Sequence, residues 1–338
     1  MKNKNLFVSA ALSLLPLAVP AGAADRMIFG EDDRVEIYQM PEKFRAAADS
    51  TVSLWKKNSL TLDTATGEYK LAVYKFGLAY NLCGGTKFME QPVGANCSGA
   101  LVGEDLVVTA GHCVVTAADC ANTKFVFGFA MNPDGSARTS VPAGEVYGCA
   151  RILARENSSV TTDNDGESVT VQGPDYALIQ LDHKVSGHKP LPVDRSAGPK
   201  KGDRVFVTGH PSGLPFKFAG NASVVRPVDP RLAYFHTDLD VFGGNSGSPV
   251  FNADTGLIIG VHVRSETGHF LPTFEGCNTY TVRPAGVGRG GEVTKIGFAA
   301  ALIPPTPDES AAQASVAAAL DSLRGDLPRL AESVSFGE

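Results

Sequence analysis

The chain has 338 residues, a formal net charge of −6 and a sequence pI of about 5.7. Because nucleic acids and anionic membranes attract basic proteins, this acidic balance argues against either one as a partner. The length exceeds that of one small domain, and six cysteines without a Cys-x-x-Cys pair are typical of a disulfide-bonded exported protein rather than of a zinc or redox site.

Residues 1–23 have the three parts of a secretory signal. Two lysines precede the apolar run LFVSAALSLLPLAV, and the small residues AGA end at position 23. The apolar run is too short for a membrane span, and no later run approaches the ~18 residues that a span needs. We therefore expect a short pro-piece at 24–27 and a mature protein that is secreted or periplasmic and not inserted in a membrane.

Many short runs along the chain alternate apolar and polar residues, with Gly, Pro, Asn and Asp between them, which favours an all-β barrel architecture. The run 106–110 reads as a buried strand, and His112 stands where it ends. Cys97 lies sixteen positions before Cys113, the residue after the histidine. A disulfide between them would tie two strands together and fix the imidazole, whereas a lone histidine at a strand end is more often structural.

The segment PDYALIQLD, residues 174–182, places Asp175 directly before an apolar strand. A carboxylate there can be partly buried and face another side chain, although alone it would be read as a turn residue. The polar segment 156–174 before it reads as an exposed loop or a hairpin.

The segment GGNSGSPV, residues 243–250, places Ser246 in a glycine-rich turn. A serine hydroxyl attacks a carbonyl only with a base beside it and backbone N–H donors aimed at the oxyanion. Glycines allow the tight turn that points those donors inward. The order His112, Asp175, Ser246 is one of the known arrangements of the serine-hydrolase triad.

The motifs TAGHC, DYALIQL and GGNSGSPV resemble the three signatures of trypsin-like, chymotrypsin-fold serine proteases, over roughly residues 28–302. This resemblance implies an all-β fold of two six-stranded antiparallel β-barrels with the active site in the cleft between them. It places the barrels at 28–182 and 201–302, with a connection at 183–200. It also implies a monomer that acts on protein or peptide substrates and needs no cofactor or metal.

The resemblance assigns a role to each residue of the triad. Ser246 would attack the carbonyl, His112 would take up and return its proton, and Asp175 would orient the imidazole. The backbone N–H groups of Gly244 and Ser246 would form the oxyanion hole.

Within the family, the chain is most similar to bacterial glutamyl endopeptidases. Asn245 replaces the aspartate that binds a new N-terminal ammonium in animal digestive enzymes, so that ion pair cannot form. The Asp33-Arg34 pair and the segments 206–211 and 256–263 resemble parts of the glutamyl branch. HtrA-type proteases add a peptide-binding domain, for which the 36 residues after position 302 are too few.

Specificity before the scissile bond stays open between an acidic, a basic and a broader preference. His262 and Arg264, on the strand that should line the pocket, favour glutamate through charge-assisted hydrogen bonds. Val241 replaces a threonine that binds the carboxylate in glutamyl endopeptidases. Asp240 lies six positions before Ser246, as the pocket aspartate of trypsin does, which favours Lys or Arg.

The remaining cysteines and the tail complete the sequence predictions. Cys120 and Cys149 bracket a predicted strand pair, which leaves Cys83 and Cys277 by elimination. The tail, 303–338, should form a linker and a C-terminal helix. At its start, Thr306 and Glu309 have the spacing of a capping box, and Pro307 stands at the first helical position.

Two readings from other classes of protein stay open beside this one. A non-catalytic relative of the fold would serve as a binding module, but such proteins usually lose a triad residue, and all three are present here. An esterase of the α/β-hydrolase type requires the motif GxSxG and the chain order Ser, Asp, His. Here the segment around Ser246 reads GNSGS, and the chain order is His, Asp, Ser.

Overall fold

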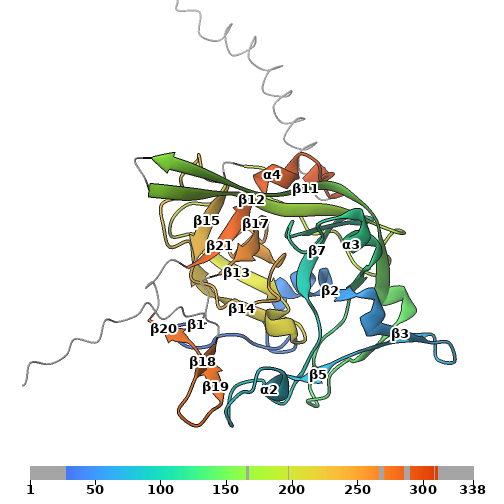
Figure 1. Ribbon diagram of the computed structural model, residues 1–338. Helices are drawn as coiled ribbons and strands as arrows, with labels where there is room; N and C mark the ends of the chain where they lie inside the picture. Colours follow the sequence, from blue (N-terminus) through green and yellow to red (C-terminus); the bar gives the residue numbers. More distant parts are fainter. Residues whose placement is uncertain are drawn as a thin grey trace, which may run out of the picture.

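The computed structural model describes residues 28–164, 167–196, 198–265, 270–284, 290–307 and 309–310. The predicted signal and pro-piece, and the tail after residue 310, lie outside these ranges. Strands make up most of the regular structure (Figure 1). None of the helices within these ranges has the length and hydrophobicity that a membrane crossing requires.

The first barrel is a closed antiparallel sheet of six strands in the order β11-β12-β8-β7-β2-β9. Its strands alternate inward and outward side chains, so the apolar residues of neighbouring strands meet inside. Val52, Leu101 and Phe125 belong to this interior, and none of them is exposed. The strands are β2 (Thr51–Lys56), β7 (Cys97–Gly103), β8 (Leu106–Thr109), β9 (Thr123–Val126), β11 (Val146–Asn164) and β12 (Glu167–Leu181).

The segment 156–174 is part of a long antiparallel pair rather than a loop. β11 and β12 pair from Cys149↔Leu181 to Asn164↔Glu167, with three register shifts between these ends. The hairpin interpretation of this polar segment is therefore confirmed, and the alternative of an exposed loop is wrong. β12 also contacts β17 (Ile258–Arg264) and β21 (Gly291–Lys295) of the second barrel, so this ribbon helps to join the two halves.

The second barrel is an antiparallel sheet in the order β14-β13-β16-β17-β21-β15. A single bridge, Val224↔Thr237, joins its two edge strands. The predicted two-barrel fold with six strands in each half is thus confirmed, although only the first barrel is fully closed and the second is a half-barrel. Its strands are β13 (Arg204–Gly209), β14 (Lys217–Ser223), β15 (Tyr234–Thr237), β16 (Pro249–Asn252), β17 (Ile258–Arg264) and β21 (Gly291–Lys295).

A hydrophobic core continues from one barrel into the other. Val108 and Tyr176 of the first barrel belong to the same buried cluster as Phe206, Phe251 and Val261 of the second. Burial of apolar surface at this junction stabilises the relative placement of the barrels, and therefore of residues contributed by each.

The predicted connection, 183–200, runs between the barrels, and its described residues lie outside the strands given above. The N–H of Leu191 donates to Leu101 O in β7, and Val193 bridges to Ile258 in β17. The exact domain boundaries given above stay predictions.

Short elements surround the barrels. The minor strands are β1 (Ile28–Phe29), β3 (Leu60–Asp63), β4 (Glu68–Leu71), β5 (Tyr74–Lys75), β6 (Pro92–Val93), β10 (Ser140–Pro142), β18 (Phe270–Pro272), β19 (Asn278–Tyr280) and β20 (Val282–Arg283). The helices are α1 (Arg45–Asp49), α2 (Phe76–Ala79), α3 (Ala117–Ala121) and α4 (Gly297–Ala300), and the 3-10 turns are η1 (Glu42–Phe44), η2 (Lys57–Ser59), η3 (Ala143–Glu145) and η4 (Pro211–Gly213).

All six cysteines form disulfides, which confirms the two pairs predicted from their positions and the one left by elimination. The pairs are Cys97–Cys113, Cys120–Cys149 and Cys83–Cys277. The last pair closes a separation of 194 residues and joins the two halves of the chain.

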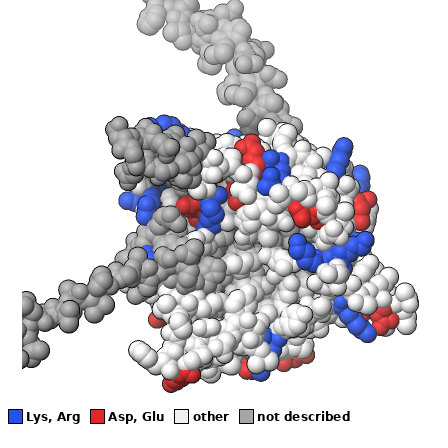
Figure 2. Space-filling model, viewed as in Figure 1, with Lys and Arg blue, Asp and Glu red and all other residues white. Residues whose placement is uncertain are grey.

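The face seen in Figure 2 carries basic and acidic side chains interspersed, with no continuous patch of either sign.

The predicted capping box at the start of the tail is confirmed. The N–H of Thr306 donates to Glu309 Oε2 at 2.7 Å, and the N–H of Glu309 donates to Thr306 Oγ1 at 3.2 Å. Arg195 pairs with Glu309 at 3.1 Å and so ties this turn to the rest of the chain. The continuation of the predicted helix lies beyond the described residues.

Candidate active site

His112 and Asp175 form a hydrogen-bonded pair at the edge of the first barrel. The Nδ1–H of His112 donates to Asp175 Oδ2 at 2.8 Å, and its backbone N–H donates to Asp175 Oδ1 at 3.1 Å. The carboxylate is buried, while the imidazole is about one-third exposed, with a relative side-chain accessibility of 35%. With the proton on Nδ1, Nε2 is left to accept a proton from a nucleophile.

A glycine in the TAGHC motif brings this pair together. β8 and β12 are neighbours, with Thr109 opposite Ala177. A Cβ added at Gly111 would collide with Glu156 O and lie 2.8 Å from Tyr176 O. Only glycine therefore lets the chain after β8 approach the β11–β12 ribbon closely enough for His112 to reach Asp175.

The first barrel holds the turn that carries Ser246. The N–H of Ser98, in β7, donates to Ser246 O at 2.8 Å, and the Ser98 hydroxyl donates to Gly244 O at 2.8 Å. Gly247 has a φ of 89°, and a Cβ there would collide with Ser98 O and Thr109 Oγ1. The turn thus packs against the strand end from which His112 follows.

The structure brings Ser246 to the same side as the His112–Asp175 pair. The Sγ of Cys113, the residue next to His112, lies 3.6 Å from Ser246 O. Among the residues described, no hydrogen bond joins Ser246 Oγ to His112. Catalytic hydrogen bonds of ligand-free enzymes often tighten only when substrate binds, so this arrangement is compatible with a triad.

The predicted oxyanion donors lie in a tight turn that requires glycine. Gly244 has a φ of 91°, and a Cβ there would lie 2.5 Å from His210 O and 2.8 Å from Gly213 N. Within the described part of the chain, the N–H groups of Gly244 and Ser246 form no hydrogen bond, which leaves both available to a ligand. The neutral Asn245 is buried and accepts a hydrogen bond from Ser248 Oγ at 3.2 Å.

Val241 and His262 both lie beside Gly291, a residue that the sequence analysis did not identify. A Cβ added at Gly291 would lie 3.1 Å from His262 Cε1 and 3.3 Å from Val241 Cγ2. His262 is buried, and its Nε2 is 3.0 Å from Ser265 Oγ. The glycine pair at 290–291, whose second residue begins β21, was the signal in the sequence that could have found it.

Asp240 holds the start of the described chain. It is 4% exposed, its Oδ1 accepts from Phe29 N at 2.8 Å, and its Oδ2 accepts from Asp33 N at 3.2 Å. The sequence predicted a partner in the substrate, whereas both oxygens here bind main-chain N–H groups. Desolvation by burial raises the pKa of this carboxyl to about 8.

Arg34, in the same segment, is a buried cation. Its guanidinium lies 4.2 Å from the ring centroid of Phe242 and 4.6 Å from that of Tyr280, and it binds Asp32. Such cation–π contacts are strong when they are desolvated. They attach the segment around Arg34 to the loop that leads to Ser246.

Arg264 has partners other than the predicted substrate carboxylate. Its Nε donates to Glu292 Oε2 at 2.7 Å, and its Nη1 lies 3.5 Å from Asp175 Oδ2. The role of Arg264 in binding a substrate carboxylate stays a prediction, and in this structure two carboxylates of the protein already contact its guanidinium.

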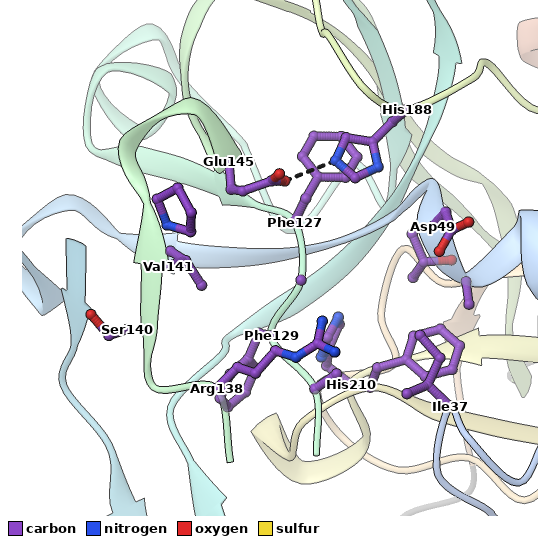
Figure 3. Close-up of a pocket in the computed structure, with 16 residues that line it drawn as sticks. Ile37, Asp49, Phe127, Phe129, Arg138, Ser140, Val141, Glu145, His188 and His210 are labelled. Atoms are coloured by element: carbon purple, nitrogen blue, oxygen red, sulfur yellow. Dashed lines mark hydrogen bonds and ion pairs between the residues drawn. The ribbon is translucent and has the colours of Figure 1, made fainter. Parts of the chain in front are cut away.

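A separate cavity of about 310 Å³ is lined by residues that include Phe127, Phe129 and His210 (Figure 3), and His112, Asp175 and Ser246 are not among its lining residues. His210 is in its wall, and burial lowers the pKa of that imidazole to about 3. The backbone N–H of His210 donates to Ser98 Oγ at 2.9 Å, so the same residue supports the nucleophile turn through Ser98.

Two clusters in the described part of the chain have the side-chain types of a metal site. They are Cys97, His112 and Cys113, and Cys83, Glu275 and Cys277. In each cluster the two cysteines are joined in a disulfide, and a disulfide lacks the thiolates that bind metal ions.

Residues 97–261 match the family described as the trypsin-like peptidase domain. The Secreted RxLR effector protein 73 of Plasmopara viticola is 27% identical over 177 residues, which are 49% of this chain and 40% of that protein. The chain thus spans less than half the length of that relative.

Solved structures of two proteases have a similar fold. A Glu endopeptidase in complex with MPD has a TM-score of 0.42 and 15% identity, covering 82% of this chain and 96% of that one. The VesB protease of Vibrio cholerae has a TM-score of 0.44 and 14% identity, covering 82% and 67%. Likeness at this level carries no argument about substrate or mechanism.

The buried carboxyl of Asp240 predicts a pH dependence of stability. Because its pKa is raised from 3.8 to about 8 in the folded protein, folding favours the protonated form. The stabilising contribution is present below pH 4 and is lost as the pH rises to about 8. Asp240→Asn keeps an acceptor for Phe29 N and removes the titration. Thermal unfolding between pH 4 and 8 should show the wild type losing stability relative to this variant, and a constant difference would contradict the assignment.

Proposed function

Because the chain belongs to the trypsin-like, chymotrypsin-fold serine proteases, we propose that it is an exported serine endopeptidase that forms an acyl-enzyme on Ser246. The observation that carries this proposal is the pair His112–Asp175, bonded at 2.8 Å beside the glycine-rich turn of Ser246. Family membership implies protein or peptide substrates, and we propose that the enzyme acts as a monomer.

The proposed reaction begins when the Ser246 hydroxyl attacks the substrate carbonyl. The hydroxyl proton passes to His112 Nε2, which later gives it to the leaving amine as the C–N bond breaks. Asp175 accepts the Nδ1–H bond throughout and stabilises the imidazolium. Water then attacks the acyl-enzyme with His112 again acting as base, which releases the acid product and restores the Ser246 hydroxyl.

The N–H groups of Gly244 and Ser246 would receive the negative charge that develops on the carbonyl oxygen. Each such donor is worth roughly 3–4 kcal/mol of transition-state stabilisation in this type of site. The hydrogen bond from the Ser98 hydroxyl to Gly244 O supports the proposal, because it holds the turn in place before substrate arrives.

Export is part of the proposal. The signal-like sequence at 1–23 and the three disulfides both fit an oxidising compartment, either the periplasm or the exterior. The relative from Plasmopara viticola is named as a secreted protein, which supports the same inference.

For specificity, we favour an acidic residue before the scissile bond. His262 beside Val241 and Gly291 offers an imidazole at the wall of the expected pocket. The basic alternative is less favoured, because both oxygens of Asp240 already accept N–H bonds from residues 29 and 33.

Replacement of the nucleophile tests the reaction. Ser246→Ala should fold normally and lose at least ~10³-fold in kcat/KM on a denatured protein substrate, because the acyl-enzyme cannot form. Ser140→Ala, which removes an exposed hydroxyl bonded to Glu68, is the matched control and should keep full activity. Undiminished turnover by Ser246→Ala would refute the assignment.

Replacement of His262 tests the specificity. His262→Ala should lower kcat/KM by roughly tenfold or more for a peptide with Glu before the scissile bond, and much less for the same peptide with Gln, since the lost bond is charge-assisted. Ser265→Ala, which removes only the hydroxyl 3.0 Å from Nε2, should have a smaller effect. Equal losses on both peptides would show that His262 does not recognise the acid.

A further inference from the structure

We propose that Arg264 is a positioning residue of the triad. It places a fixed positive charge beside Asp175, and its ion pair with Glu292 sets the orientation of its guanidinium. This inference rests on the proposed function, because it concerns the proton that His112 carries in that reaction. It gives Arg264 a role inside the protein instead of a role in binding an acidic substrate.

The geometry puts Arg264 and His112 on the same oxygen. Asp175 Oδ2 accepts the Nδ1–H of His112 at 2.8 Å and lies 3.5 Å from Arg264 Nη1. Asp175 is 2% exposed, so its carboxylate depends on protein groups for the stabilisation that water would provide. Arg264 supplies a permanent cation there, since a guanidinium does not deprotonate in proteins.

Glu292 fixes the direction of the guanidinium. β17 and β21 pair with Arg264 opposite Glu292, and the two side chains bond at 2.7 Å. Arg264 Nη2 also lies 3.4 Å from Gly173 O, just ahead of Asp175 in the chain. Glu292 is 6% exposed, so the loss of Arg264 would leave a buried carboxylate without this cation.

The two charges act on His112 in opposite directions. Arg264 disfavours the imidazolium because like charges repel, and Glu292 offsets part of that repulsion. Removing the cation should therefore make His112 easier to protonate, and removing the anion should make it harder. A purely structural role would not predict opposite signs for the two substitutions.

Other groups face this ion pair. Among the described residues they are Asp175 from β12, and Tyr234 and His236 from β15. The Arg264 guanidinium lies 5.7 Å from the Tyr234 ring centroid, and His236 Nε2 lies 3.9 Å from Glu292 Oε1. Because His236 carries a second ionisable imidazole beside Glu292, the test includes a His236→Gln background.

The deciding experiment is an NMR titration of the His112 ring, made in a Ser246→Ala background so that it does not depend on catalysis. Relative to that parent, Arg264→Met should raise the midpoint by roughly 0.5–1 pH unit, and Glu292→Gln should lower it by a similar amount. Arg264→Lys should restore the parent value in large part, and the opposite signs should persist with His236→Gln. Shifts of the same sign, or unchanged midpoints in folded variants, would overturn the proposal.

Kinetics separates this inference from the proposed function. The acid limb of kcat/KM should move with the NMR midpoints on a peptide without acidic residues. If Arg264→Met instead raised only KM, and only for peptides with Glu before the scissile bond, Arg264 would be a substrate-binding residue. Absence of all wild-type proteolysis would refute the proposed function, while the titration would still decide the role of Arg264.

Discussion

The active site depends on the attachment of the nucleophile turn to the first barrel. Ser98 makes this attachment twice, through its N–H to Ser246 O and through its hydroxyl to Gly244 O, each at 2.8 Å. Gly247 allows the close approach, since any side chain there would collide with β7 and β8. The barrel that contributes His112 and Asp175 therefore also fixes the main chain around Ser246. The continuous core between the barrels stabilises this relative placement of the two barrels.

The second barrel is stabilised from the other side by the first described residues. The buried cation of Arg34 lies against Phe242, and the carboxyl of Asp240 binds the N–H groups of residues 29 and 33. Asn245 cannot form the ion pair that an aspartate makes with a new N-terminus. This network attaches residues 29–34 to the loop before Ser246 by a different route.

Local motifs carried most of what the sequence predicted. His112, Asp175 and the disulfides Cys97–Cys113 and Cys120–Cys149 could be predicted because strand ends and cysteine spacing are visible within short windows, whereas Cys83–Cys277, 194 residues apart, followed only by elimination. The partners of Asp240 and Arg264 could not, because they are distant in sequence: Phe29 is 211 positions from Asp240. The segment 156–174 was ambiguous in the sequence, since its polar residues lack a clear apolar face. The need for glycine at position 291 could be recognised only from the structure, where His262 and Val241 lie beside it.

The central claim is that Ser246 is a nucleophile activated by His112 and Asp175. The most direct test is covalent labelling with a phosphonofluoridate probe, followed by peptide mapping by mass spectrometry. The account predicts one probe per molecule, on Ser246, with labelling abolished in a His112→Ala variant that still folds. Labelling on another serine, or equal labelling without His112, would contradict it.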